Sequence, residues 1–94
     1  MTQEQMLLLL KNDLQILTEA NDAYLTALLQ QAQIAITQEG IILGSDYQSA
    51  LIQVQYAAYL FRKRAAADTT MPRFLRYQLN NMLMSQKGGA ANDI

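Results

Sequence analysis

The chain has 94 residues, of which 51% are hydrophobic and 16% are charged, and its formal net charge is -1. This length allows one domain, and so apolar a composition excludes an intrinsically disordered chain. The absence of cysteine and histidine excludes disulfides, thiolate or imidazole catalysis and the usual zinc, copper and iron ligand sets, and favours a protein that folds inside the cell without a cofactor.

The sequence predicts helices and no sheet, because one proline and four glycines leave long uninterrupted segments rich in leucine, alanine, glutamine and methionine. The first helix is expected to begin after Thr2, with Gln5 as its capping-box partner, and to end near Gln15. The apolar run of residues 6–10 is too short for a membrane span and lacks the basic residues that precede a signal-peptide core. We therefore expect a chain that is soluble at synthesis and carries no targeting segment.

A second helix is expected from about residues 19–21 to Glu39, with Gly40 as its stop. Its apolar residues fall within about 100° of one another at about 100° per residue, which predicts one core-facing stripe. Ile34 points away from the stripe and is expected to be a single exposed apolar residue rather than a subunit contact. The stripe consists of Leu25, Leu28, Leu29, Ala32 and Ile36.

A short apolar connector, residues 41–44, precedes a third helix. Ser45 and Gln48 are expected to open this helix as a capping box, and it should run to about Ala65. Residues 56–61 are apolar on all sides, which is typical of a helix enclosed by others. The third helix is therefore expected to lie at the centre of the domain.

A loop over residues 65–70 leads to a fourth helix. Pro72 suits its first position, because the missing N–H of proline costs nothing there. The fourth helix is expected to run to about Gln86, and Gly88 and Gly89 are expected to end it.

These elements predict an all-α, four-helix single domain with two long central helices. The helical domain should cover residues 1–87, and a short, flexible C-terminal tail should cover residues 88–94. The sequence shows no internal repeat and no low-complexity tract.

The charge is unevenly distributed along the chain. Residues 1–61 carry one lysine against six carboxylates, a net charge of -5, and residues 62–94 carry six basic residues against two carboxylates, a net charge of +4. Because the two halves carry opposite net charges, the basic half could contact an acidic protein surface, including the N-terminal half of a second copy. The candidate assembly surface is Arg62, Lys63, Arg64, Pro72, Arg73, Arg76 and Lys87, and the candidate acidic partner surface is Asp13, Glu19, Asp22 and Glu39.

Other interpretations of the basic residues remain open. The basic residues of the fourth helix lie on one side together with Asn80, which is also typical of a solvated helix face or of phosphate contact. Cations at the end of the third helix also complement its dipole. A helix-turn-helix is disfavoured, because the loop is long and the fourth helix begins with proline and apolar residues rather than with base-reading side chains.

Nothing in the sequence indicates an enzyme. No nucleophile–base pair, metal-ligand cluster or phosphate-binding loop is present. The neighbouring acids Asp13, Glu19 and Asp22 lie at predicted helix ends, where capping and the helix dipole favour carboxylates without any chemistry.

Three segments together resemble the small helical head-to-tail connector, or adaptor, proteins of long-tailed bacteriophages, a family of DNA-packaging and head-completion proteins. The first segment is the pattern D-x-x-L-x-x-L-[LI]-x-x-A-x-x-x-I, from Asp22 to Ile36. The second is AAYLFRKR, residues 57–64, and the third is MPRFLR, residues 71–76. Their order and spacing extend the resemblance over about residues 5–87.

The resemblance implies a structural subunit that assembles with copies of itself into a ring, commonly of about twelve. Such a ring lies beneath the portal of the virion, between the portal protein and a tail or head-completion protein, and forms in the host cytoplasm. DNA passes through its lumen without sequence recognition, and no catalytic residue, cofactor or membrane is involved. The basic residues at the end of the third helix and the start of the fourth match the family's basic loop-and-helix region.

A ring suggests that acidic residues of the first two helices in one copy approach the basic stripe of the last helix in the next copy. Two alternatives from other functional classes remain open. One is a small DNA-binding regulator, and the other is a helical partner of another small protein, as in an antitoxin-like module.

Overall fold

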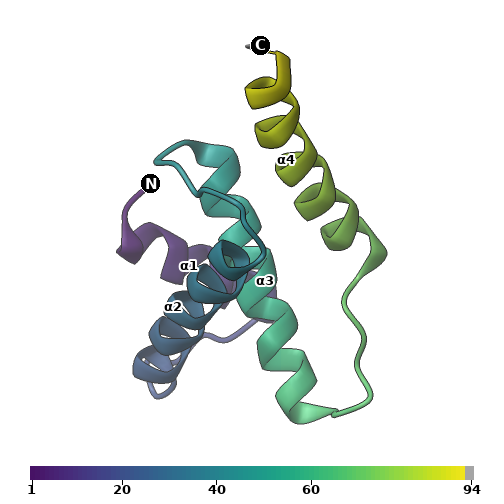
Figure 1. Cartoon of the computed structure of the whole chain (residues 1–94). Helices are drawn as coiled ribbons and strands as arrows, with labels where there is room; N and C mark the ends of the chain where they lie inside the picture. The colour runs from purple at the N-terminus through teal and green to yellow at the C-terminus, as the bar shows by residue number, and fades with distance from the viewer. Residues whose placement is uncertain (93–94) are drawn as a thin grey trace.

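Four α-helices make up most of the fold in the computed structural model, which describes residues 1–92 and the side chains of residues 1–87 (Figure 1). They are α1 (Gln3–Leu14), α2 (Asp22–Gln38), α3 (Tyr47–Ala65) and α4 (Arg73–Asn92). Within residues 1–92 there is no strand. The predicted all-α, four-helix fold is confirmed.

The first helix begins and ends as predicted. The Thr2 hydroxyl accepts a hydrogen bond from the Gln5 N–H at 3.2 Å, and the Thr2 N–H donates to the Gln5 side chain at 2.8 Å. This reciprocal capping box satisfies two backbone donors that the first turn would otherwise leave without a partner. At the other end Gln15 adopts a left-handed conformation, with φ of 59°, and stops the helix.

The core-facing stripe predicted on α2 is confirmed, since all five of its residues are buried. Ile34, on the other side of the same helix, is 57% exposed. Gly40 follows the last turn with φ of 95°, a backbone conformation that side chains with a Cβ rarely adopt. The chain therefore turns sharply from α2 into the connector of residues 41–44.

The predicted capping box of Ser45 and Gln48 is wrong, because Asp46 caps α3 instead. The Asp46 carboxylate accepts hydrogen bonds from the Ser49 N–H at 3.1 Å and from the Ser49 hydroxyl at 2.7 Å. The Ser49 hydroxyl also accepts the N–H of Gly44 at 3.2 Å. Two carboxylate oxygens satisfy more donors than one Ser45 hydroxyl could, so α3 starts one residue later than the capping box implied.

Helix α3 lies at the centre of the fold, as predicted, with α1 and α2 on one side and α4 on the other (Figure 1). Its residues Val54, Ala57 and Ala58 join a first buried cluster with α1 and α2. Ile52 joins a second buried cluster, which holds α4. The small alanines allow close approach of the helices, and each cluster removes apolar area from water at about 25 cal/mol per Å². The second cluster consists of Ile36, Ile41, Ile52, Leu75 and Leu79.

Helix α4 differs from the prediction at both ends. Its first residue is Arg73, and Pro72 stands just before it, with its carbonyl accepting the Arg76 N–H at 3.1 Å. The predicted end near Gln86 is wrong, because α4 continues through Gly88 and Gly89 to Asn92. Glycine lowers helix propensity by only about 1 kcal/mol, and no proline follows to force a stop.

With 20 residues α4 is as long as the two central helices, which have 17 and 19. The tail predicted over residues 88–94 thus overlaps the end of α4 and reaches residues 93–94, which lie outside the described residues. Its flexibility stays a prediction.

Burial of the α2 stripe should account for much of the stability. We expect Leu29→Ala to lower the free energy of unfolding by about 2 to 5 kcal/mol, because it removes buried methyl groups and leaves a cavity. Ile34→Ala, on the exposed side of the same helix, is the matched control and should change it by no more than about 0.5 kcal/mol. Urea unfolding followed by circular dichroism measures both, and equal effects would contradict the assignment of the core face.

The Asp46 cap should make stability depend on acid pH. Hydrogen bonds from the Ser49 hydroxyl and then from the Ser49 N–H lower the pKa of the Asp46 carboxyl. A lowered folded-state pKa adds stability above the unfolded-state pKa of about 4, and this stability is lost as pH falls through the folded-state value.

We expect Asp46→Asn, which keeps an N-cap oxygen but cannot ionise, to flatten this part of the stability–pH curve measured by urea unfolding. Asp68→Asn, in the loop before α4, serves as the control and should leave the curve's shape unchanged. A variant curve as steep as that of the wild type would remove Asp46 as the cause.

Candidate functional site

Among the side chains of residues 1–87, three ion pairs join charges within the chain. Lys11 Nζ lies 2.8 Å from Asp22 Oδ1, and Arg62 Nη2 lies 3.1 Å from Asp13 Oδ2. These pairs use two residues of the predicted acidic surface and one of the predicted basic surface. The pair of Arg62 with Asp13 connects α3 to α1, so the opposite halves of the chain already neutralise each other in part.

The third pair joins α4 to the rest of the fold. Arg76 Nη2 donates to both oxygens of Glu39, at 2.8 and 3.1 Å, with side chains 39% and 28% exposed. The hydrogen bond to Glu39 raises the pKa of Arg76 above its usual value. Burial, and then the Glu39 carboxylate, raise the pKa of the Tyr56 hydroxyl nearby. Arg76 therefore fastens the start of α4 to the end of α2.

The other cations at the end of α3 lie over aromatic rings. Arg64 is 4.9 Å from the centroid of the Tyr24 ring, and Lys63 Nζ is 5.7 Å from that of Tyr59. Lys63 also donates to the Tyr59 hydroxyl at 3.4 Å. The cluster of residues 62–64 thus makes contacts within its own chain, in addition to complementing the α3 dipole.

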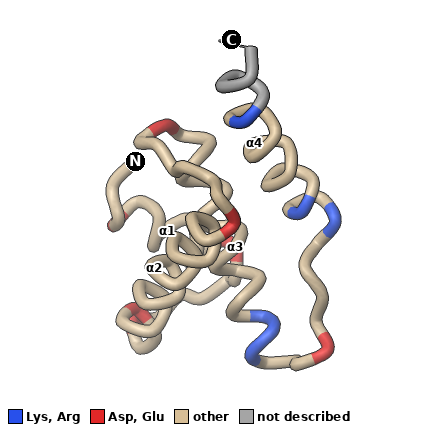
Figure 2. The backbone as a smooth tube through the Cα atoms, viewed as in Figure 1, with Lys and Arg blue, Asp and Glu red and all other residues tan. Residues whose placement is uncertain are grey.

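Few of the predicted site residues remain available to a second molecule. Of the predicted residues, Arg73 and Lys87 on α4 and Glu19 before α2 make no ion pair within residues 1–87. Glu4 on α1, which was not among the predicted residues, also makes none. Pro72 is exposed at the start of α4. Figure 2 shows the basic residues on α4 and at the end of α3, and most acidic residues on the other elements.

An apolar surface that the sequence did not predict covers the outward side of α4. Phe74, Tyr77 and Met84 are 61%, 59% and 70% exposed and lie within about 80° of one another at about 100° per residue. We call these three residues the outer stripe. It lies opposite Leu75 and Leu79, which face the core, and Arg73 and Lys87 flank one edge of it. The signal in the sequence was the presence of large apolar residues on both sides of one helix.

A shallow apolar pocket of about 390 Å³ lies where the beginnings of α1 and α3 meet. Leu8 and Tyr47 are 60% and 63% exposed there. Glu4 stands one helical turn before Leu8 on α1, so its carboxylate neighbours a residue that lines the pocket. We call it the N-terminal pocket, and its lining consists of Met1, Gln5, Leu8, Leu9 and Tyr47.

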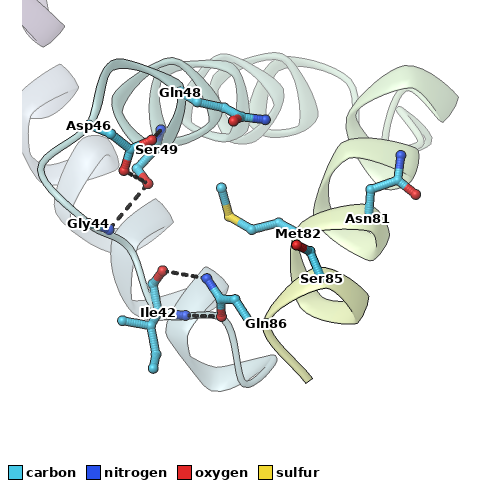
Figure 3. Close-up of a pocket in the computed structure, with 9 residues that line it drawn as sticks. All are labelled: Ile42, Gly44, Asp46, Gln48, Ser49, Asn81, Met82, Ser85 and Gln86. Carbon is cyan, nitrogen blue, oxygen red and sulfur yellow. Dashed lines mark hydrogen bonds between the residues drawn. The ribbon is translucent and has the colours of Figure 1, made fainter. Parts of the chain in front are cut away.

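A polar cleft of about 530 Å³ separates α4 from the connector and the start of α3 (Figure 3). The Ile42 N–H donates to Gln86 Oε1, and Gln86 Nε2 donates to the Ile42 carbonyl, both at 2.9 Å. One side chain thus satisfies both backbone groups of Ile42. The carboxylate at this cleft, Asp46, caps α3 by accepting hydrogen bonds from the Ser49 N–H and hydroxyl.

The described residues contain no group of three or more acidic side chains placed to hold a metal ion. Across the same part of the chain, no helix combines the length and the apolar character needed to cross a membrane.

The ion pair at the start of α4 should contribute more than the exposed pair at α3. In a double-mutant cycle with Arg76→Met and Glu39→Gln, we expect a coupling energy of about 0.5 to 1 kcal/mol. The matched cycle, Arg62→Met with Asp13→Asn, should give about 0.3 kcal/mol or less, because these side chains are 50% and 51% exposed. Thermal unfolding at low and high salt measures both, and a reversed order would refute the role given to Arg76.

Comparison of the chain with protein-family models, curated proteins and solved structures found no match. The resemblance carried by the three sequence segments therefore stays a prediction. The features that bear on function are the outer stripe, the N-terminal pocket and the charges beside them.

Proposed function

We propose that this protein is a structural subunit of the head-to-tail connector of a long-tailed bacteriophage. Copies assemble into a ring beneath the portal, and the genome passes through the ring. The portal protein and a tail or head-completion protein are its other partners, and the role requires no catalysis and no cofactor. The resemblance of residues 22–36, 57–64 and 71–76 supports this proposal, together with the four-helix fold.

One observation carries the proposal of self-assembly. The outer stripe exposes three large apolar side chains along one side of a helix, and exposed apolar surface that is rimmed by polar residues can mark a site of contact with another protein. The N-terminal pocket is a second apolar surface of different shape on other elements. Two unlike surfaces on one subunit are what a ring needs, because each copy meets its two neighbours through different faces.

The charged residues available for the proposed contact between copies are fewer than those expected from sequence alone. Asp13, Asp22 and Glu39 have partners within their own chain, and so do Arg62 and Arg76. Charges that steer one copy toward the next would therefore come mainly from Arg73 and Lys87.

A DNA-binding regulator is the weaker candidate. Binding of duplex DNA needs several cations on one face to replace counterions along the phosphates. In this chain Arg62 and Arg76 are engaged with carboxylates, and the Lys63 ammonium lies over the ring of Tyr59. The apolar side chains of the outer stripe also fit a protein surface better than a phosphate backbone.

The test measures assembly over a wide range of protein concentration, alone and with the portal protein of the same phage. Light scattering coupled to size-exclusion chromatography should show oligomers that grow with concentration or form on the portal, and negative-stain electron microscopy should show rings. A chain that stays monomeric and does not bind the portal would overturn the proposal. Dimers that bind duplex DNA with a steep salt dependence would support the regulator instead.

A further inference from the structure

We infer that the outer stripe of one copy docks into the N-terminal pocket of the next copy. The partner is thus a second copy of this chain, held by a heterologous contact. This inference rests on the proposed function and specifies which surfaces would join the subunits.

The chemistry of the outer stripe suits an apolar, concave partner with negative charge beside it. Phe74 and Tyr77 present aromatic rings, and aromatic side chains carry much of the energy at the centres of protein interfaces. Arg73 and Lys87 lie along one edge of the stripe and make no ion pair within residues 1–87. The stripe therefore combines apolar anchors with cations that a carboxylate could meet.

The N-terminal pocket supplies the complementary features. Its volume of about 390 Å³ is lined largely by the apolar side chains of α1 together with Tyr47. Glu4, one helical turn before Leu8, makes no ion pair within residues 1–87. The Glu4 carboxylate beside an apolar hollow thus matches cations beside an apolar ridge.

The positions of the two surfaces exclude their contact within one copy and favour contact between copies. Figure 1 shows the N-terminus and α1 on the opposite side of the fold from α4, and the outer stripe lies on the side of α4 that is turned away from the buried Leu75 and Leu79. A ridge on one side and a hollow on the other generate a head-to-tail series, which closes into a ring when the rotation between copies is suitable.

Other exposed apolar residues do not offer an equal surface. Leu17, Ile34 and Ile42 are 93%, 57% and 75% exposed, but they belong to three different elements: the loop after α1, the outer face of α2 and the connector. None of them lines the N-terminal pocket. Substituting one of them, such as Ile34, therefore tests whether loss of any exposed apolar side chain affects assembly.

The test uses one variant for each surface and mixes them. The stripe variant is Tyr77→Asp with Met84→Asp, the pocket variant is Leu8→Asp with Tyr47→Asp, and the control is Ile34→Asp. All five side chains are more than half exposed, so the variants should fold, which circular dichroism checks. Each surface variant should raise the concentration for half-maximal assembly by about tenfold or more, whereas the control should not.

Mixing distinguishes a head-to-tail contact from a symmetric one. Each variant keeps one intact surface, so an equimolar mixture should form a 1:1 heterodimer and no larger ring. Stripe-to-stripe pairing predicts instead that the pocket variant assembles like the wild type. That result would overturn the inference.

A cysteine test adds a direct measurement, because the chain has no cysteine of its own. Tyr77→Cys in one copy should form a disulfide with Leu8→Cys in another, and Ile34→Cys should not. If the wild type assembles but both surface variants assemble equally well and no Tyr77–Leu8 crosslink forms, this contact is wrong and the proposed ring stands. If the wild type assembles under no condition, with or without the portal, the proposed function itself fails.

Discussion

The fold depends on the burial of α3 from two sides. Ala57 and Ala58 let α1 and α2 approach closely on one side, and Ile52 meets the residues that hold α4 on the other. A chain of 94 residues buries only a little more than about 60% of its unfolded surface, so it cannot spare either cluster. One side of α4 therefore packs against the second cluster. The other side, which carries Phe74 and Tyr77, stays in contact with solvent.

Much of the charge is also used inside the fold. Ion pairs between Arg62 and Asp13 and between Arg76 and Glu39 join elements of the same chain. From the sequence alone, these opposite charges were expected to attract a second molecule. What stays available is apolar surface with a few cations and carboxylates beside it. In the proposed contact between copies, such a surface would derive its affinity from excluded water and its orientation from charge.

The helices and their core faces could be predicted from sequence, and the site could be predicted only in part. The α2 stripe followed from spacing, and Thr2 with Gln5 from a local hydrogen-bond motif, since both depend on residues within a few positions of each other. Ser45 and Asp46 are neighbours that can each cap a helix, and the path of the connector decides between them. The partner of Arg76 lies 37 positions away, so composition revealed its charge but not its contact. Likewise, periodicity marks two apolar sides on α4 without saying which one the core covers.

The paired hydrogen bonds between Gln86 and Ile42 have a consequence for the geometry of any assembly. Two hydrogen bonds from one planar amide resist rotation of α4 about its own axis. The buried Leu75 and Leu79 lie near the start of α4 and would by themselves leave its later part freer to rotate. In a closed ring each copy is turned by the same angle from the one before it, so a small change in the roll of α4 adds up around the circle. A single glutamine side chain, which makes no part of the outer stripe but lies on the same helix, would then help to set how many copies complete a turn.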